Sequence, residues 1–236
     1  MHERPVAYEH EGTTLDGLLA VDAAEPGLRP AVLVVHGMEG RSGAQVDFVR
    51  RLTAWGYAGF AVDLFGIGED GDIGRGERLM MEMLEDRDLV RRRMLYVLDL
   101  VRDLPEVDSD RVAAVGFCFG GLCVLDLARS GAEVRGVASF HGVLTPPEGG
   151  ERNEIRAMVT VFHGWDDPFA PPEHVVGLGK ELTEAGTDWQ VHAYGNTMHA
   201  FMAPMANNPE AGIMYNERSA RRAWSSLGSF LTETFA

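Results

Sequence analysis

The sequence has few cysteines, few basic residues and no long apolar run, and each shortage excludes a class of protein. Its two cysteines, Cys118 and Cys123, are too few for a small secreted fold held together by disulfides. No stretch approaches the ~18 uninterrupted apolar residues of a membrane span, and no apolar signal segment follows residues 1–5. We therefore expect a cytoplasmic protein that does not enter a membrane.

Positive charge is scarce as well. Lys and Arg number 21 against 36 Asp and Glu, which gives a formal net charge of −15. Because nucleic acids and anionic lipid surfaces are bound through Lys and Arg, neither is an expected partner. The chain also has no His-x-x-x-His or Cys-x-x-Cys spacing, so we expect no metal site and no cofactor.

The order of apolar segments predicts the fold. Residues 6–10 and 14–21 alternate between apolar and polar side chains, as in an antiparallel hairpin. Short runs that are apolar on both faces are typical of parallel strands covered by helices, and they fall at 31–35, 59–62, 112–115, 134–140, 158–162 and 189–194. Helical periodicity falls between or after them, at 45–55, 79–104, 122–129, 172–185 and 218–234.

This alternation, together with a length of 236 residues, predicts one α/β domain over residues 1–236. We expect a mostly parallel central sheet with helices on both faces and an N-terminal antiparallel hairpin. In such a sheet, ligands bind beyond the carboxyl ends of the strands. The residues that follow each apolar run are therefore the first candidates for a site.

A glycine-rich turn follows the run 112–115 and precedes a helix, with the sequence Gly116-Phe117-Cys118-Phe119-Gly120-Gly121. This is the Gly-x-nucleophile-x-Gly pattern, with Cys in place of the more usual Ser. The glycines allow a sharp strand-to-helix turn, and the partial positive charge of the helix start favours a thiolate. A lone cysteine is more often an inert buried thiol, and we assign that role to Cys123. Cys118 is the candidate nucleophile because an acid and a base follow it after later strands.

The acid candidate, Asp167, follows the run 158–162. Pro168 restricts Asp167 to extended backbone and so fixes the direction of its carboxylate. Asp166 competes for the same role. The base candidate, His199, lies in a loop after the last strand, where an imidazole can reach the nucleophile while a carboxylate holds its other nitrogen. The weaker candidates are His36, His141 and His163, each before a glycine at a strand end, and His2, His10, His174 and His192.

These residues resemble the dienelactone hydrolase family of α/β-hydrolases. The similarity rests on the Gly-x-Cys-x-Gly-Gly elbow, the Gly-x-x-Asp segment that ends at Asp167 and the His-Ala-Phe at His199, and it extends from the hairpin to the last helix, including 57–64. The resemblance implies an α/β-hydrolase fold and a Cys118, His199, Asp167 triad that cleaves a small ester or lactone through a thioester. It places the acid at Asp167, the residue directly before Pro168-Phe169, rather than at Asp166.

The resemblance also implies an oxyanion hole made of the backbone N–H groups of Met38 and Phe119. The family has a Glu that holds the resting cysteine as a thiol, and this chain has Gly37 at that position. Glu39 either takes over as an auxiliary residue or is only a polar loop residue.

The family's substrate-binding arginines are the second departure. One of them lies a few residues after the catalytic His, where residues 200–204 contain no cation. The other could correspond to Arg75 or Arg78, and the sequence does not decide between them. A contact with a substrate carboxylate is therefore in question.

Apolar side chains beside the triad predict an apolar pocket for a small-molecule substrate, with core packing as the alternative for each of them: Phe117, Trp165, Phe169, Met198 and Phe201. Two other functions stay open. Gly37, Gly40 and Gly43, with Asp63 after the next strand, suggest a nucleotide-binding protein, although the spacing lacks the usual Gly-x-Gly. A thiol redox sensor on the same fold would also use an exposed Cys118. We expect a monomer or a homodimer.

Overall fold

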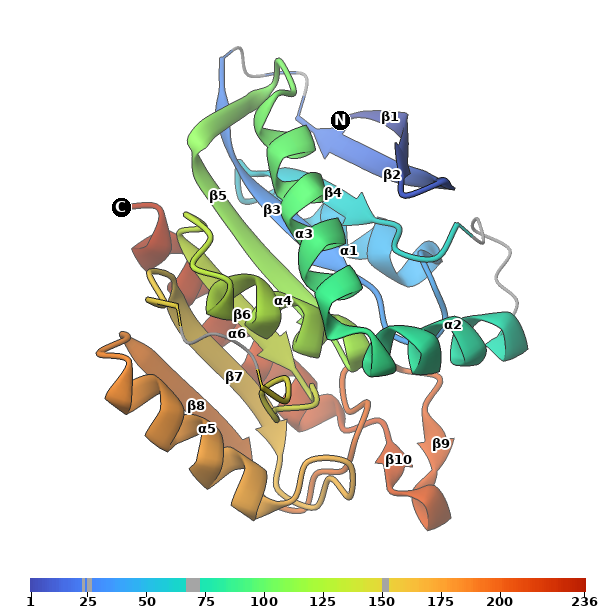
Figure 1. Cartoon of the computed structure of the whole chain (residues 1–236), viewed down its shortest axis with the longest axis vertical. Helices are drawn as coiled ribbons and strands as arrows, with labels where there is room; N and C mark the ends of the chain where they lie inside the picture. Colours follow the sequence, from blue (N-terminus) through green and yellow to red (C-terminus); the bar gives the residue numbers. More distant parts are fainter. Residues whose placement is uncertain (23, 25–26, 67–72, 150–152) are drawn as a thin grey trace. The chain divides into compact units, whose positions relative to one another are not determined.

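The computed structural model describes residues 1–22, 24, 27–66, 73–149 and 153–236 (Figure 1). They form two compact units, Met1–Val115 and Gly116–Ala236. The boundary falls inside strand β5 (Val107–Phe117). The assignment of the whole chain to one domain stays a prediction.

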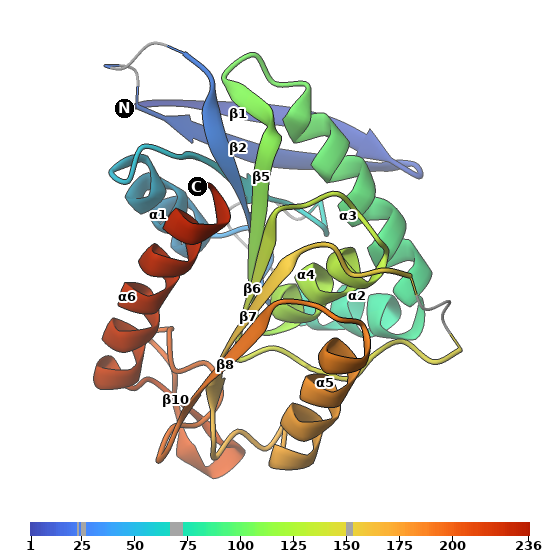
Figure 2. The ribbon, with the colours of Figure 1, turned by 90° about the vertical axis from the view of Figure 1, so that its left-hand side faces the viewer.

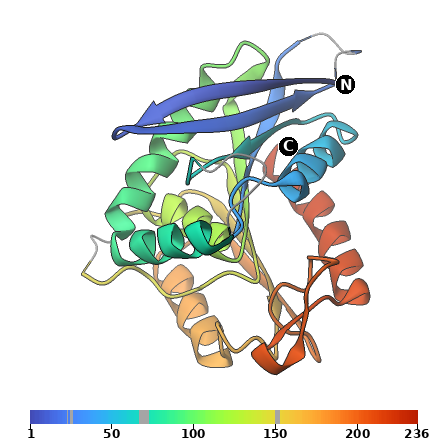
Figure 3. The same cartoon turned by 90° about the vertical axis from the view of Figure 1, so that its right-hand side faces the viewer.

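In the first unit, the strands follow the order β1-β2-β4-β3-β5. β1 (His2–His10) and β2 (Thr13–Val21) form an antiparallel hairpin, and β2 is also antiparallel to β4 (Ala58–Val62). β3 (Arg29–Val35) is parallel to β4, whose residues are all buried. α1 (Gly43–Thr53) and α3 (Arg87–Arg102) lie on opposite faces of this sheet, which explains why β4 is apolar on both sides (Figures 2 and 3).

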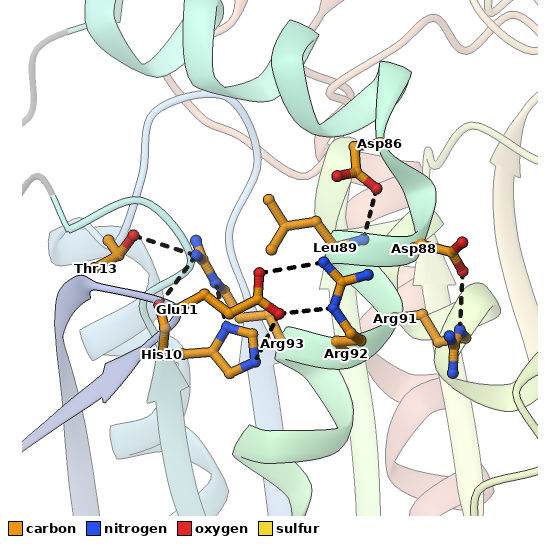
Figure 4. Close-up of polar contacts among 9 residues, drawn as sticks. All are labelled: His10, Glu11, Thr13, Asp86, Asp88, Leu89, Arg91, Arg92 and Arg93. Atoms are coloured by element: carbon orange, nitrogen blue, oxygen red, sulfur yellow. Dashed lines mark hydrogen bonds and ion pairs between the residues drawn. The ribbon is translucent and has the colours of Figure 1, made fainter.

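The prediction of a single helix over 79–104 is wrong, because two helices occupy this region: α2 (Ile73–Glu85) and α3. Asp86 lies between them and caps α3, where its Oδ1 accepts a hydrogen bond from Leu89 N at 2.9 Å (Figure 4). Such a cap satisfies an amide that has no partner inside the helix, and so favours a new helix start. The apolar periodicity continues through the break, so periodicity alone predicts one helix.

Two arginines of α3 hold the turn of the hairpin (Figure 4). The turn residues Glu11 and Gly12 have φ of 49° and 74°, left-handed values that match the twist of the flanking strands. Arg92 forms two hydrogen bonds with the Glu11 carboxylate, at 2.7 and 3.2 Å. The buried Arg93 donates to Thr13 Oγ1 at 3.3 Å and to Leu64 O at 2.6 Å. Arg93 therefore joins the hairpin to the segment that follows β4.

In the second unit, three parallel strands follow the order β6 (Gly136–Phe140), β7 (Met158–Gly164) and β8 (Trp189–Tyr194). α6 (Glu217–Thr234) lies on one face, and α4 (Phe119–Arg129) and α5 (Pro172–Glu184) lie on the other (Figure 2). A short antiparallel pair that no sequence pattern predicts, β9 (Asn207–Asn208) and β10 (Ile213–Met214), flanks the 3₁₀ turn η1 (Pro209–Ala211). The predicted mostly parallel sheet with helices and an N-terminal hairpin is confirmed.

Each unit has a core of large apolar side chains, which include Phe60, Leu33 and Met94 in the first and Phe140, Phe162 and Phe201 in the second. Within the described ranges, no helix combines the length and the apolar character that crossing a bilayer requires.

Candidate active site

Cys118 lies in the turn between the end of β5 and the start of α4. Its φ of 53° and ψ of −115° form a conformation that non-glycine residues rarely adopt. The turn is held by hydrogen bonds from Cys118 N to Phe140 O and from Gly121 N to Cys118 O, both at 3.0 Å. Cys118 is partly exposed, whereas Cys123 is buried, and both are free thiols. The backbone therefore presents the Cys118 side chain outside the core.

Two glycines make this turn possible. A Cβ atom on Gly116 would overlap the carbonyl group of Gly120, and one on Gly121 would come within 2.6 Å of Ser139 Oγ. Both approaches are closer than an ordinary van der Waals contact, so any larger residue would force the strand and the helix apart. The steric requirement expected from the sequence is present at these two positions.

Asp167 and His199 come from different loops and meet in a buried hydrogen bond. His199 Nδ1 lies 2.7 Å from Asp167 Oδ2, and the two side chains are only 7% and 0% exposed. The other carboxylate oxygen of Asp167 accepts from Phe169 N at 2.9 Å, which fixes the orientation of the carboxylate. Asp166 is exposed, and its backbone N–H donates to Thr197 O. The structure thus pairs His199 with Asp167.

The partners of His199 determine its charge. Burial on its own lowers the pKa of His199, but hydrogen bonds with Asp167 and Cys118 outweigh burial and raise the pKa to about 9. Because Asp167 holds Nδ1, Nε2 is the nitrogen that remains for the Cys118 sulfur. His199 therefore carries a proton near neutral pH, between a carboxylate and a thiol. The geometry brings together the three residues predicted as a triad.

Two more buried histidines lie in the same unit. The ring of His141 is 5.0 Å from that of His199, centroid to centroid, and His141 has a φ of 38°. Burial and the nearby charge of His199 lower the pKa of His141 well below its usual value. Burial also lowers the pKa of His163. Both rings are therefore neutral near pH 7, and neither can replace His199 as the charged partner of Asp167.

The predicted pocket residues differ in exposure. Trp165 and Phe169 are 44% and 48% exposed, and the Phe169 ring lies 4.8 Å from the ring of His199. Phe201 is fully buried. Intermediate exposure is found at Phe117 and Met198. Phe169 and Trp165 are thus the most exposed of the predicted pocket residues.

His36 and its neighbours belong to the first unit. His36 is fully buried, its Nε2 accepts from Leu64 N at 3.0 Å, and its Nδ1 lies 2.7 Å from Gly37 O. Burial lowers the pKa of His36. These contacts account for His36 as a neutral residue that holds a turn.

Other predicted site residues also lie in the first unit. Glu39 accepts hydrogen bonds from Gly37 N at 3.3 Å and from Gln45 Nε2 at 2.8 Å. Arg75 and Arg78 are exposed residues of α2. The oxyanion role of Met38, the auxiliary role of Glu39 and the carboxylate contact of either arginine stay predictions. In the part of the chain that the structure describes, no cluster of His, Cys, Asp or Glu could hold a metal ion.

Comparison with known proteins identifies the family. The sequence model of the dienelactone hydrolase family matches residues 15–235. The chain belongs to this family. A crystal structure of a dienelactone hydrolase-like promiscuous phosphotriesterase from metagenomic libraries is 33% identical, with a TM-score of 0.94 over 100% of this chain and 99% of that one.

Two curated relatives match this chain over different lengths. An uncharacterised protein of Caenorhabditis elegans is 34% identical over 158 residues, which are 65% of this chain and 100% of that protein. A putative carboxymethylenebutenolidase of Aquifex aeolicus is 27% identical over 233 residues, 95% of this chain and 96% of the relative. The predicted α/β-hydrolase fold and hydrolase class are confirmed, and the nucleotide-binding alternative is not favoured. The cytoplasmic location and the monomeric or dimeric state stay predictions.

Two features of this dienelactone hydrolase-family site are absent from the predictions made above. One is the left-handed backbone of His141, for which the sequence carries no local signal. The other is Asn216, which caps α6 by accepting from Ser219 N at 3.1 Å. An Asn directly before a periodic helix is a recognisable N-cap signal, so the cap was predictable. Its contacts with the loop of His199 were not.

Proposed function

We propose that the chain hydrolyses a small neutral ester or lactone through a thioester on Cys118, with His199 as acid and base and Asp167 as the orienting carboxylate. One observation carries the proposal: the buried 2.7 Å contact of His199 with Asp167, on a histidine whose pKa is raised to about 9 beside Cys118. The strained turn at Cys118 supports it, because strain of this kind is concentrated at functional sites.

In the first half-reaction, the Cys118 sulfur attacks the acyl carbon, and the carbonyl electrons move to oxygen. We assign Phe119 N–H as a donor to this oxyanion, because the first amides of a helix point out of its N-terminus. The bond to the leaving oxygen then breaks, and the departing alkoxide takes the proton of His199. A thioester and a neutral imidazole remain.

In the second half-reaction, neutral His199 takes a proton from water as the water oxygen attacks the thioester carbon. Collapse expels the Cys118 sulfur as a thiolate and releases the acid, which ionises in water. The Asp167 carboxylate stabilises the imidazolium that forms. A lactone gives a hydroxy acid, because its acyl group and its leaving alkoxide belong to one molecule.

Neutral substrates are favoured by the residues that follow His199. A buried pair between Arg and carboxylate would favour an anionic substrate, but residues 200–204 contain no cation. Desolvating a substrate carboxylate without such a partner costs several kcal/mol. The exposed rings of Trp165 and Phe169 instead offer apolar contact.

A neutral phosphotriester is a second candidate substrate, favoured by the full-length similarity to a promiscuous phosphotriesterase. Attack of the Cys118 sulfur on phosphorus would expel one alcohol and leave a phosphorothiolate on the enzyme. Attack by water would then release the phosphodiester and restore the thiol. Both steps need the same acid and base as ester hydrolysis.

The test compares wild type and Cys118→Ala on four substrates: p-nitrophenyl butyrate, an aryl ester that carries a carboxylate, a simple neutral lactone and the phosphotriester paraoxon. We expect wild type to have its highest kcat/KM on a neutral carboxylic ester or lactone, and Cys118→Ala to lose roughly 10³-fold or more in kcat. Substantial turnover by Cys118→Ala would reject the thioester mechanism. A redox sensor would acylate once and then stop.

A further inference from the structure

The loop that carries His199 contains two residues in an unfavourable backbone conformation. Asn196 and Ala200, on either side of His199, have φ of 52° and 55°, in the left-handed region that non-glycine residues mostly avoid. Such conformations persist only where surrounding contacts hold them. The contacts of this loop therefore determine where the His199 imidazole lies.

Asn216, the N-cap residue of α6, contacts the loop on both sides of His199. Its side-chain Nδ2 donates to Asn196 O and to Thr197 Oγ1, each at 3.3 Å. Its backbone N–H donates to Phe201 O at 3.2 Å. Segments before and after His199 are thus bound to a single residue at the start of a helix.

The two ends of the Asn216 amide have different tasks. The Oδ1 atom accepts from Ser219 N at 3.1 Å and caps α6. Since a backbone N–H needs an acceptor, this contact directs the oxygen toward α6 and leaves the NH₂ group for the loop. An Asp at this position can keep the cap but cannot donate to the loop.

Thr197 extends these contacts to the loop of Asp167. Thr197 is buried, and its Oγ1 lies 2.8 Å from Ser219 Oγ. Its backbone carbonyl accepts from Asp166 N at 2.9 Å, one residue before Asp167. The loops that carry the acid and the base therefore share Thr197, which Asn216 and Ser219 attach to α6.

We propose that Asn216 is a positioning residue, whose side-chain NH₂ keeps the His199 imidazole in register with Asp167 and Cys118. This inference rests on the proposed function, in which His199 transfers the proton. Asn216 acts through the loop and not on the substrate. Its loss therefore lowers kcat far more than it raises KM.

Asn216→Asp tests the proposal with p-nitrophenyl butyrate as substrate. Because Asp caps a helix about as well as Asn, Tm should stay within roughly 2 °C of wild type. We expect kcat to fall roughly 10- to 100-fold, as misplacement of a catalytic group does, with KM changed less than about threefold. A kcat within about twofold of wild type would overturn the proposal.

His199→Asn, measured in parallel, separates this proposal from the proposed function. If His199→Asn is nearly inactive while Asn216→Asp is fully active, only the role of Asn216 fails. If His199→Asn keeps most of its kcat, the proposed function fails as well.

Asp86→Ala is the matched control for helix capping. Asp86 caps α3 through the same kind of contact with a backbone N–H (Figure 4). Asp86→Ala and Asn216→Ala should each lower Tm by roughly 2–4 °C, but only Asn216→Ala should lower kcat. If Asn216→Ala does not fold, Thr197→Val removes the hydroxyl and nearly keeps the side-chain shape, and it should lower kcat as well. Wild-type kcat in Thr197→Val, or equal kcat in the two cap variants, contradicts the role of Asn216.

Discussion

Each unit contains a buried histidine and a buried aspartate at or beyond strand ends, and the two pairs differ in their partners. In the first unit, Asp63 accepts three hydrogen bonds from backbone N–H groups, at 2.9 to 3.0 Å. The ring nitrogens of His36 likewise contact backbone atoms, Gly37 O at 2.7 Å and Leu64 N at 3.0 Å. Both side chains hold turns.

In the second unit, Asp167 uses one oxygen for a backbone N–H and the other for the ring of His199. Burial lowers the pKa of His36. Burial also opposes a charge on His199, yet hydrogen bonds with Asp167 and Cys118 raise its pKa to about 9. Residue type, burial and place after a strand are thus alike in the two units. What separates a candidate site from a turn is a partner that is itself a titratable side chain.

The largest expected effect comes from replacing each histidine by Asn. His199→Asn should lose roughly 10³-fold or more in kcat, because no base remains for the nucleophile or for water. His36→Asn should keep kcat within about tenfold and lose roughly 1–3 kcal/mol of stability, since buried hydrogen bonds are broken. Steady-state kinetics and urea unfolding measure the two effects. Equal loss of kcat in both variants would abolish the distinction between the pairs.

The aspartates provide the second comparison. In Asp167→Asn, the amide NH₂ would face His199 Nδ1 and favour the tautomer that carries its proton on Nε2, so kcat should fall roughly 10³- to 10⁴-fold. Asp63→Asn should mainly destabilise the fold, by about 1–3 kcal/mol, because the amide NH₂ meets a backbone donor. Both variants are compared with wild type by kcat and by urea midpoint. Near-normal kcat in Asp167→Asn would show that His199 does not depend on Asp167 for its orientation.

The pH dependence of stability should differ in sign between the histidines. A histidine with a raised pKa stabilises the fold fully below the unfolded pKa of 6.5, and this stabilisation is lost as the pH rises through about 9. The difference in free energy of unfolding between wild type and His199→Asn should therefore shrink by up to roughly 3 kcal/mol between about pH 6 and about pH 10.

For His36 the lowered pKa reverses the sign. Its contribution is present above pH 6.5 and is lost as the pH falls toward the folded pKa. The difference in free energy of unfolding between wild type and His36→Asn should therefore widen, not shrink, from about pH 5 to about pH 8. Urea unfolding from about pH 5 to about pH 10 measures both differences. If the two differences changed with pH in the same direction, a protonated His199 and a neutral His36 would be contradicted.

Local sequence patterns predict much of the fold and the candidate triad, because their causes are local. The residues of β4 are apolar throughout since they are buried on both faces. Gly116 and Gly121 mark the elbow because no side chain fits there. Cys118, Asp167 and His199 follow strands, and a parallel sheet places strand ends at one edge.

Other features have causes that no local pattern carries. The apolar positions Met83, Val90 and Met94 keep helical spacing through the break at Asp86, so the break is visible only through the cap. Asn216 contacts Asn196, a residue 20 positions earlier in the chain. That contact depends on how α6 packs against β6 and β7, which the sequence of the loop does not encode.

The most direct test of the central claim is rapid-quench mass spectrometry of the enzyme mixed with p-nitrophenyl butyrate. We expect an intermediate that is heavier by one butyryl group, maps to the peptide that contains Cys118, and forms and decays at rates consistent with kcat. The adduct should be absent in Cys118→Ala and should form far more slowly in His199→Asn. Turnover by wild type with no adduct on Cys118 at any quench time, or with an adduct on another residue that decays at the rate of turnover, would contradict the account.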